Sequence, residues 1–146
     1  PAAPAAASPS AVRILVVDDN DINVMVTRRL LGRLGYAVES VRSGPEALEL
    51  LRARAHDPAA AVQLVFMDVS MPVMDGIEAT RLLRATWPAD APRPYVVALT
   101  ANSSEDDRRR CTAAGMDDFL GKPVKLDGFR QAIDRYLASR GQHASV

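Results

Sequence analysis

The sequence predicts a doubly wound α/β fold, in which five parallel strands and five helices alternate along the chain. Short and nearly continuous apolar runs, such as residues 12–17, suit strands that are buried on both faces of a parallel sheet. The segments between these runs carry apolar residues at helical spacing. Parallel strands need right-handed crossovers, so the alternation favours a three-layer (βα)5 sandwich around a flavodoxin-like sheet of order 2-1-3-4-5.

Each predicted element is bounded by a signal in the sequence. The strands are apolar runs that end near polar residues, and they cover residues 12–17, 36–41, 62–67, 95–99 and 119–120. The helices begin near capping, proline or glycine signals, and they cover residues 21–34, 45–55, 76–86, 105–114 and 126–138. The first helix carries a stripe that is expected to face the core, and it comprises Ile22, Val26, Leu30, Leu31 and Leu34. Gly35 is expected to end that helix.

Length and composition indicate one globular domain. The chain has 146 residues, 48% of them hydrophobic, and its 18 basic and 18 acidic residues cancel. We therefore expect no direct contact with nucleic acid, and no apolar stretch approaches the roughly 18 residues that a membrane span needs. Residues 1–10 are predicted to be a Pro/Ala-rich linker, residues 11–139 the folded domain and residues 140–146 a flexible tail. The single cysteine, Cys111, fits a reducing compartment such as the cytoplasm.

Polar residues follow the predicted strands at their carboxyl ends. Asp18 and Asp19 follow the first strand, Asp68 the third, Thr100 the fourth and Lys122 the fifth. Ligands bind outside these ends in open α/β sheets, and the order 2-1-3-4-5 would bring the three aspartates into one cleft. Clustered carboxylates repel one another unless a cation is present, and Mg²⁺ prefers carboxylate, water and phosphate oxygens. The pattern therefore predicts a Mg²⁺ and phosphate site, where a carboxylate can itself accept a phosphoryl group.

Four motifs together resemble the receiver domain of two-component response regulators. They are Ile14-Leu-Val-Val-Asp-Asp-Asn20, Val65-Phe-Met-Asp-Val-Ser-Met-Pro-Val-Met-Asp-Gly76, Ala98-Leu-Thr-Ala101 and Phe119-Leu-Gly-Lys-Pro123. The resemblance extends over residues 13–137. Each motif alone has little specificity, whereas the four in this order at strand ends are highly specific. Residues 97–102 and 115–124 look most like receivers that are fused to hybrid sensor histidine kinases.

The resemblance implies a role for each acidic residue of the cleft. Asp68 would accept the phosphoryl group and also bind Mg²⁺. Asp19 would be a direct Mg²⁺ ligand, and Asp18 would act largely through water. The backbone carbonyl of Ser70 would be a further protein ligand.

The resemblance also implies roles for three residues around the phosphoryl group. Lys122 would pair with its oxygens, and the Lys122–Pro123 peptide bond is expected to be cis. Thr100 would turn its hydroxyl toward the phosphoryl group. Phe119 would follow Thr100 inward, which would switch the packing of the face near the fourth helix and fifth strand.

Plainer structural roles stay open for the same residues. The acidic pair could cap the first helix, Thr100 could be a helix N-cap or a turn residue, and Lys122 could be a solvated loop lysine. Phe119 is a core aromatic under either interpretation. Residues 108–110, three consecutive arginines, could form the solvated face of a short helix or a patch that docks a partner.

The function that the resemblance implies is signalling. The domain would take a phosphoryl group from phosphohistidine and would catalyse only that transfer and its own hydrolysis. Its partners would be a histidine kinase domain, a histidine phosphotransfer protein, or both. We expect it to belong to a hybrid histidine kinase, with a stand-alone single-domain regulator as the alternative, and to lie in the cytoplasm without touching the membrane.

Two other functions on related folds fit the motifs less well. A haloacid-dehalogenase-like phosphatase needs a second aspartate two residues after the nucleophile, where this chain has Ser70. A flavodoxin-like flavin carrier needs a phosphate loop rich in glycine and hydroxyl groups after the first strand, where this chain has Asp-Asp-Asn-Asp over residues 18–21. A phosphate loop made of carboxylates is unfavourable without a metal ion.

Overall fold

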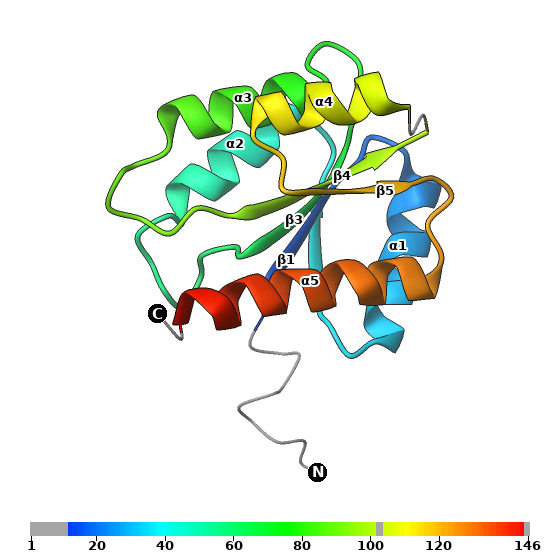
Figure 1. Ribbon diagram of the computed structural model, residues 1–146, viewed down its shortest axis with the longest axis horizontal. Coiled ribbons are helices and arrows are strands. Elements are labelled where there is room, and N and C mark those ends of the chain that lie inside the picture. Colours follow the sequence, from blue (N-terminus) through cyan, green and yellow to red (C-terminus); the bar gives the residue numbers. More distant parts are fainter. Residues whose placement is uncertain (1–11, 102–103, 145–146) are drawn as a thin grey trace.

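The computed structural model describes residues 12–101 and 104–144, and within them five strands alternate with five helices (Figure 1). The strands are β1 (Ile14–Val17), β2 (Val38–Val41), β3 (Leu64–Asp68), β4 (Tyr95–Thr100) and β5 (Asp118–Gly121). The helices are α1 (Asp21–Arg33), α2 (Gly44–Ala53), α3 (Gly76–Thr86), α4 (Glu105–Ala114) and α5 (Leu126–Ala144). The predicted linker, residues 1–10, lies outside the described residues.

The strands form one parallel sheet in the order β2-β1-β3-β4-β5, which confirms the predicted fold class. Strand β1 lies between β2 and β3, so that Asp18, directly after β1, and Asp68, at the end of β3, leave the sheet side by side. Thr100 at the end of β4 pairs with Gly121 at the end of β5. The segments that carry the predicted site residues therefore leave the same edge of the sheet.

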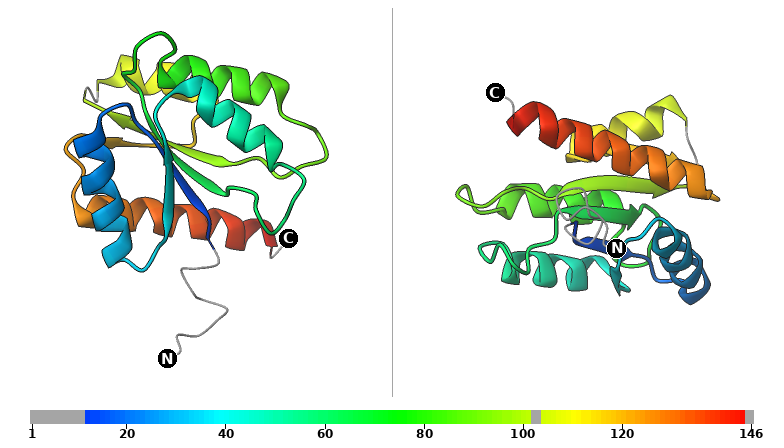
Figure 2. Two further views of the ribbon diagram at one scale, coloured as in Figure 1. Left: turned by 180° about the vertical axis from the view of Figure 1, so that it is seen from behind. Right: turned by 90° about the horizontal axis from the view of Figure 1, so that it is seen from below.

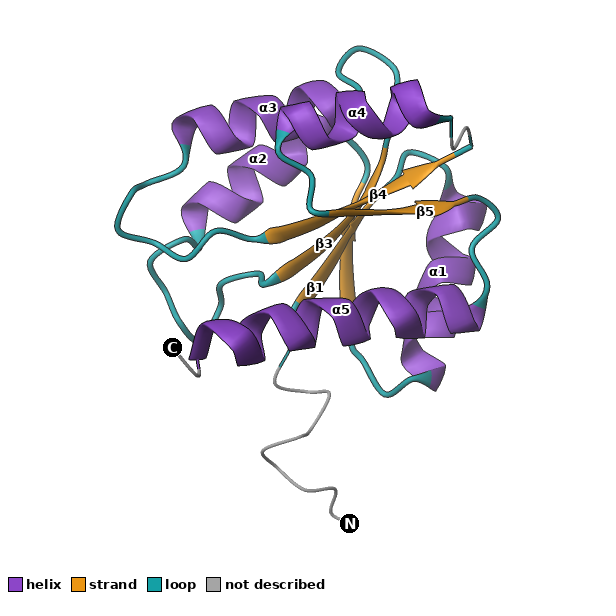
Figure 3. Ribbon diagram, viewed as in Figure 1, coloured by secondary structure: helices purple, strands orange, loops and turns teal. Residues whose placement is uncertain are grey.

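The helices form two layers, one on each face of the sheet (Figures 2 and 3). Helices α1 and α5 cover one face, and α2, α3 and α4 cover the other. Alternate residues of each strand supply the two cores, because successive side chains point to opposite faces. Ile14 and Val16 pack on the α1 and α5 side, whereas Leu15 and Val17 pack on the opposite side. None of the helices within the described ranges is long and apolar enough to cross a membrane.

Most element bounds lie within two residues of the prediction, and β2 and α5 show why a bound can shift. Strand β2 begins at Val38 rather than at residue 36, because the Tyr36 N–H donates to the Leu31 carbonyl and still belongs to the end of α1. Gly35, with φ 98°, makes this helix ending possible and confirms the predicted stop. Helix α5 continues to Ala144, beyond the predicted end at residue 138 and into the segment that was expected to be a tail. No proline interrupts residues 139–144, and the good helix formers Arg140, Gln142 and Ala144 outnumber the single glycine, Gly141.

The apolar stripe predicted for α1 is wrong in its first two turns. Ile22 is 66% exposed and Val26 is 46% exposed. The buried side of the helix instead passes through Thr27 and Leu31. Ile22 and Val26 lie on a neighbouring face of the helix. The prediction selected that face because the buried side includes Thr27, which is polar and gives no apolar signal. A second apolar surface therefore faces outward at the start of α1.

Candidate functional site

The candidate site lies at the carboxyl edge of the sheet, where four polar residues occupy or follow strand ends. Asp68 is the last residue of β3 and is 3% exposed, and Thr100 is the last residue of β4 and is 8% exposed. Asp18 follows β1 and is 1% exposed. Lys122 follows β5 and is half-buried. The sheet thus brings together residues that lie far apart in the sequence, as their strand-end positions predicted.

Asp68 and Lys122 form an ion pair across the site. Lys122 Nζ lies 2.8 Å from Asp68 Oδ1, which also accepts a hydrogen bond from the Ser70 backbone N–H at 3.1 Å. The Lys122 backbone N–H donates to the Thr100 carbonyl at 2.8 Å, so strand β4 fixes the start of the lysine side chain. The peptide bond that follows, Lys122–Pro123, is cis, the isomer that the resemblance implies.

Three carboxylates crowd together at this edge of the sheet. Each of Asp18, Asp19 and Asp68 offers an oxygen atom within 4.8 Å of the other two. Burial raises the pKa of Asp18, the Asp68 charge raises it further, and the hydrogen bond from the Asn20 N–H opposes both effects. An all-oxygen, strongly negative and largely buried set of donors fits a hard divalent cation such as Mg²⁺.

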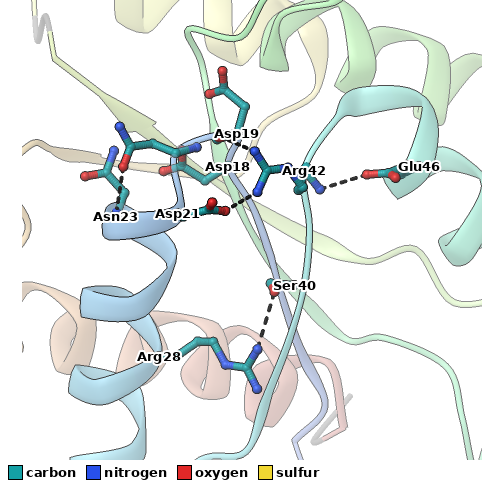
Figure 4. A network of polar contacts seen from close by, with 9 residues as sticks. Asp18, Asp19, Asp21, Asn23, Arg28, Ser40, Arg42 and Glu46 are labelled. Carbon is teal, nitrogen blue, oxygen red and sulfur yellow. Dashed lines mark hydrogen bonds and ion pairs between the residues drawn. The ribbon is translucent and has the colours of Figure 1, made fainter.

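The loop between β1 and α1 is held to the edge of strand β2 (Figure 4). The Asp18 N–H donates to the Val41 carbonyl at 3.2 Å. Arg42, the next residue, donates from Nη2 to the Asp19 carbonyl oxygen at 3.2 Å. The cap of α1 is Asn20, whose side chain accepts the Asn23 N–H, and not the acidic pair Asp18 and Asp19. Sequence reasoning missed Arg42, because a lone arginine after an edge strand carries no motif.

The loop between β3 and α3 requires a glycine next to the Asp68 backbone. The Gly76 N–H donates to the Val69 carbonyl at 3.0 Å. A Cβ atom at Gly76 would lie 2.3 Å from the Asp68 carbonyl oxygen and 2.8 Å from Met67 Cγ. No L side chain fits there unless the backbone of Asp68 moves. Gly76 is thus part of what holds Asp68 in place.

We predict that Gly76→Ala destabilises the fold and weakens the site, whereas the same change at Gly32 does neither. Gly76→Ala should lower the free energy of unfolding by about 1–3 kcal/mol, as expected for overpacking. Gly32 is a residue of α1 whose Cβ would meet nothing within 4 Å, so Gly32→Ala should raise stability by up to about 1 kcal/mol. Urea denaturation of both variants measures the difference. Equal effects of the two changes would contradict the close contact at Asp68.

The remaining predicted residues surround this centre. Ser70 is exposed and lines an open hollow together with Thr100 and residues of α4. Phe119 is half-buried and packs against the core on the α2, α3 and α4 side. The guanidinium of Arg108 lies 4.9 Å from the centre of the Phe119 ring, a cation–π distance.

The arginine run of residues 108–110 therefore divides into separate contacts. Arg109 and Arg110 pair with acidic residues of the first turn of α4. Arg108 instead covers Phe119. Of the two roles that the sequence leaves open for this run, a solvated helix face fits Arg109 and Arg110, since their side chains are 71% and 63% exposed.

Comparison with known proteins finds a matching family model and longer proteins that are similar to this chain. The family model of the response regulator receiver domain matches residues 14–134. Hybrid signal transduction histidine kinase L of Dictyostelium discoideum is 37% identical over 134 residues, which make up 91% of this chain and 8% of that protein. The chain thus spans only a small part of the length of this relative.

Solved structures of receiver domains have the same fold. The receiver domain of the histidine kinase CKI1 from Arabidopsis thaliana, complexed with Mg²⁺, is similar with a TM-score of 0.78 and 32% identity, and the match covers 88% of this chain and 93% of that one. A chain in the co-crystal structure of the Saccharomyces cerevisiae histidine phosphotransfer protein Ypd1 and the receiver domain of the response regulator Ssk1 has a TM-score of 0.74 and 28% identity, with 88% and 91% covered. Since the family model spans all five strands, the first four helices and the first half of α5, the chain belongs to the response regulator receiver domains of two-component signal transduction.

Proposed function

We propose that this receiver domain takes a phosphoryl group from a phosphohistidine onto Asp68, as one step of a two-component phosphorelay. The observation that carries the proposal is the Asp68 carboxylate, which is 3% exposed and lies 2.8 Å from Lys122 Nζ within a cluster of carboxylates. A buried carboxylate between a cation and further acidic groups is suited to accept a phosphoryl group, because phosphoryl transfer depends mainly on positioning and charge neutralisation.

Asp18, Asp19 and Asp68 are proposed to hold Mg²⁺, with the Ser70 carbonyl as a further ligand. The crowding of their oxygens within 4.8 Å and the raised pKa of Asp18 support this, because both favour a bound cation. The similar receiver domain of CKI1 was solved as a complex with Mg²⁺, which supports the choice of metal. When bound, Mg²⁺ supplies positive charge that neutralises phosphoryl oxygens.

Asp68 Oδ2 is proposed to be the attacking oxygen. Oδ1 already accepts hydrogen bonds from the Ser70 N–H and from Lys122 Nζ. A bond forms between Oδ2 and phosphorus as the bond from phosphorus to the imidazole nitrogen breaks, and the electron pair of that bond leaves with the imidazole. Lys122 then neutralises a phosphoryl oxygen. Attack by water on phosphorus later releases inorganic phosphate and restores the carboxylate.

Thr100 and Phe119 are proposed to report the state of Asp68. The Thr100 hydroxyl would donate to a phosphoryl oxygen and so would turn toward Asp68. Phe119 would move into the space that the threonine leaves, and its ring would separate from Arg108 of α4. The contact at 4.9 Å is thus one interaction of the unphosphorylated state that the switch would break.

The exposed apolar surface at the start of α1 is proposed to dock the histidine-bearing helix of the donor. Ile22, Met25 and Val26 are 66%, 47% and 46% exposed, and they lie on the two helical turns that follow the Asp18–Asp19 pair. A helix bound there would bring its phosphohistidine to the mouth of the site. The co-crystal structure of Ypd1 with the Ssk1 receiver domain supports a histidine phosphotransfer protein as this kind of partner.

The parent protein is proposed to be a hybrid histidine kinase, located with this domain in the cytoplasm. The support is the similarity to hybrid signal transduction histidine kinase L. The buried Cys111 fits a reducing compartment. The full-length reading frame that contains this chain would distinguish a hybrid kinase from a stand-alone regulator.

The experiment that tests the function compares two donors. We expect phosphoramidate with Mg²⁺ to add one phosphoryl group, which hydroxylamine removes and peptide mapping places on Asp68. Ile22→Asp should keep this labelling and should slow transfer from a phosphorylated histidine phosphotransfer protein, since only the second donor docks on α1. Intact-mass spectrometry over time measures both rates. Labelling that persists in EDTA, or that maps to another residue, would refute the assignment of Asp68.

A further inference from the structure

Arg42, the residue after β2, holds the acidic loop at two points (Figure 4). Its Nη2 donates to the Asp19 carbonyl oxygen at 3.2 Å, and its Nη1 pairs with the Asp21 carboxylate. Its own backbone N–H donates to Glu46 Oε1 at 2.9 Å, which fixes the start of the side chain against α2. One guanidinium therefore restrains the chain on both sides of Asn20.

We propose that Arg42 is a positioning residue for the metal site. By holding the Asp19 peptide, it directs the Asp19 carboxylate toward Asp18 and Asp68, with which it shares the cluster of oxygens within 4.8 Å. This inference rests on the proposed Mg²⁺-dependent function. Mg²⁺ requires nearly ideal octahedral geometry, so a ligand that is fixed in advance binds it more tightly than one that must first be ordered.

Stability alone does not explain the Arg42 contacts. The side chains of Arg42 and Asp21 are 61% and 78% exposed. Exposed ion pairs contribute little to the free energy of folding, because water screens them and both side chains lose conformational freedom. The same contacts affect the site more strongly, since one of them ends on the backbone of a proposed ligand.

The charge of Arg42 and its positioning role have opposite effects on Mg²⁺ binding. A cation near the acidic cluster repels Mg²⁺, so removing the charge alone would tighten binding. Removing the hydrogen bond to the Asp19 carbonyl would loosen the ligand and weaken binding. The direction of the change in affinity therefore tells the two roles apart.

The test is isothermal titration calorimetry of Mg²⁺ into the metal-free protein and two Arg42 variants. Arg42→Met removes the charge and both contacts, and we expect it to weaken Mg²⁺ binding about tenfold. Arg42→Lys keeps the charge, but its single ammonium group cannot donate to the Asp19 carbonyl and the Asp21 carboxylate as the planar guanidinium does. This variant should therefore recover only part of the lost Mg²⁺ affinity.

Arg28→Met is the matched control. Arg28 is an arginine of α1 that also bridges to β2, through a hydrogen bond of 3.4 Å to Ser40 Oγ, and it makes no contact with Asp19 (Figure 4). Its removal changes the net charge by the same amount. We expect the Mg²⁺ affinity of Arg28→Met to stay within about twofold of wild type, because exposed charges are screened.

The rate of labelling by phosphoramidate provides the second readout. At saturating Mg²⁺ the rate of Arg42→Met should return close to wild type, because the loss lies in metal affinity and not in Asp68. Tighter Mg²⁺ binding by Arg42→Met, or unchanged binding, would overturn the positioning role. A wild-type protein that binds no Mg²⁺ would instead overturn the proposed function itself, so the two failures are distinguishable.

Discussion

Asp68→Asn is expected to abolish labelling by phosphoramidate and Mg²⁺, because an amide oxygen is a far weaker nucleophile than a carboxylate. The variant should keep its structure at the site. The oxygen of the introduced amide can still accept the Ser70 N–H, which bonds to Asp68 Oδ1 at 3.1 Å in the wild type. The loss of labelling should amount to several orders of magnitude, as for other residues that form a covalent intermediate.

The stability of Asp68→Asn should change little, because two effects oppose each other. The substitution removes one of three crowded negative charges, and it also leaves Lys122 without its charged partner, which lies 2.8 Å away in the wild type. Because the relief of repulsion offsets the loss of the buried ion pair, we expect the free energy of unfolding to change by no more than about 1–2 kcal/mol. Urea denaturation beside intact-mass spectrometry separates loss of the nucleophile from loss of the fold.

Asp118→Asn is the matched control for this change. Asp118 lies at the start of β5, its side chain is only 14% exposed, and it pairs with Arg135 at 2.6 Å. It thus resembles Asp68 in burial and in having a cationic partner, but it lies outside the acidic cluster. Asp118→Asn should label like the wild type. Undiminished labelling of Asp68→Asn would exclude Asp68 as the acceptor.

The site could be predicted from the sequence because the fold itself brings strand ends together. Once the order of strands was predicted from the alternation of elements, the positions of Asp18, Asp68 and Lys122 after β1, at the end of β3 and after β5 followed. These positions depend on strand termini, which apolar runs indicate to within a residue or two. No side-chain detail was needed to place them at one edge of the sheet.

Contacts between loops could not be predicted in the same way. Arg42 reaches Asp19 and Asp21 because β2 happens to end beside the start of α1, and a single arginine gives no periodic signal. The buried side of α1 was missed for a related reason: it includes Thr27, a polar residue that is 7% exposed, so apolar spacing selected a neighbouring face. Sequence patterns report regular elements well and report tertiary neighbours of loops poorly.

The stability of the domain is expected to depend on Mg²⁺ and pH through Asp18. Its folded-state pKa is raised above the ordinary 3.8, first by burial. The stability that this shift contributes is fully present below pH 3.8 and is lost as the pH rises through the raised value. At neutral pH the metal-free protein therefore contains a buried, charged carboxylate that lowers its free energy of unfolding. Asp18→Asn, which removes the charge, should raise stability in EDTA by roughly 0.5–2 kcal/mol.

Mg²⁺ should reverse this order of stability. At a Mg²⁺ concentration of about 100 times its dissociation constant, the free energy of unfolding of the wild type should rise by about 2.7 kcal/mol, because the ion binds the folded state only. Asp18→Asn should gain clearly less, since it offers one carboxylate fewer to the ion. Asp134→Asn, an exposed change on α5, should gain as much as the wild type.

The pH dependence links these two results to the same carboxylate. Protons compete with Mg²⁺ for the carboxylates of the cluster, so the stability that Mg²⁺ adds to the wild type should vanish in acid. In EDTA the stability difference between Asp18→Asn and the wild type should also close as the pH falls through the raised pKa of Asp18, because the wild-type side chain then becomes neutral as well. Urea denaturation at neutral and acid pH measures both differences. An Asp18→Asn protein that is less stable than the wild type in EDTA at neutral pH would contradict this inference. It would show that the Asp18 charge stabilises the metal-free fold, whereas we infer that its burial destabilises it.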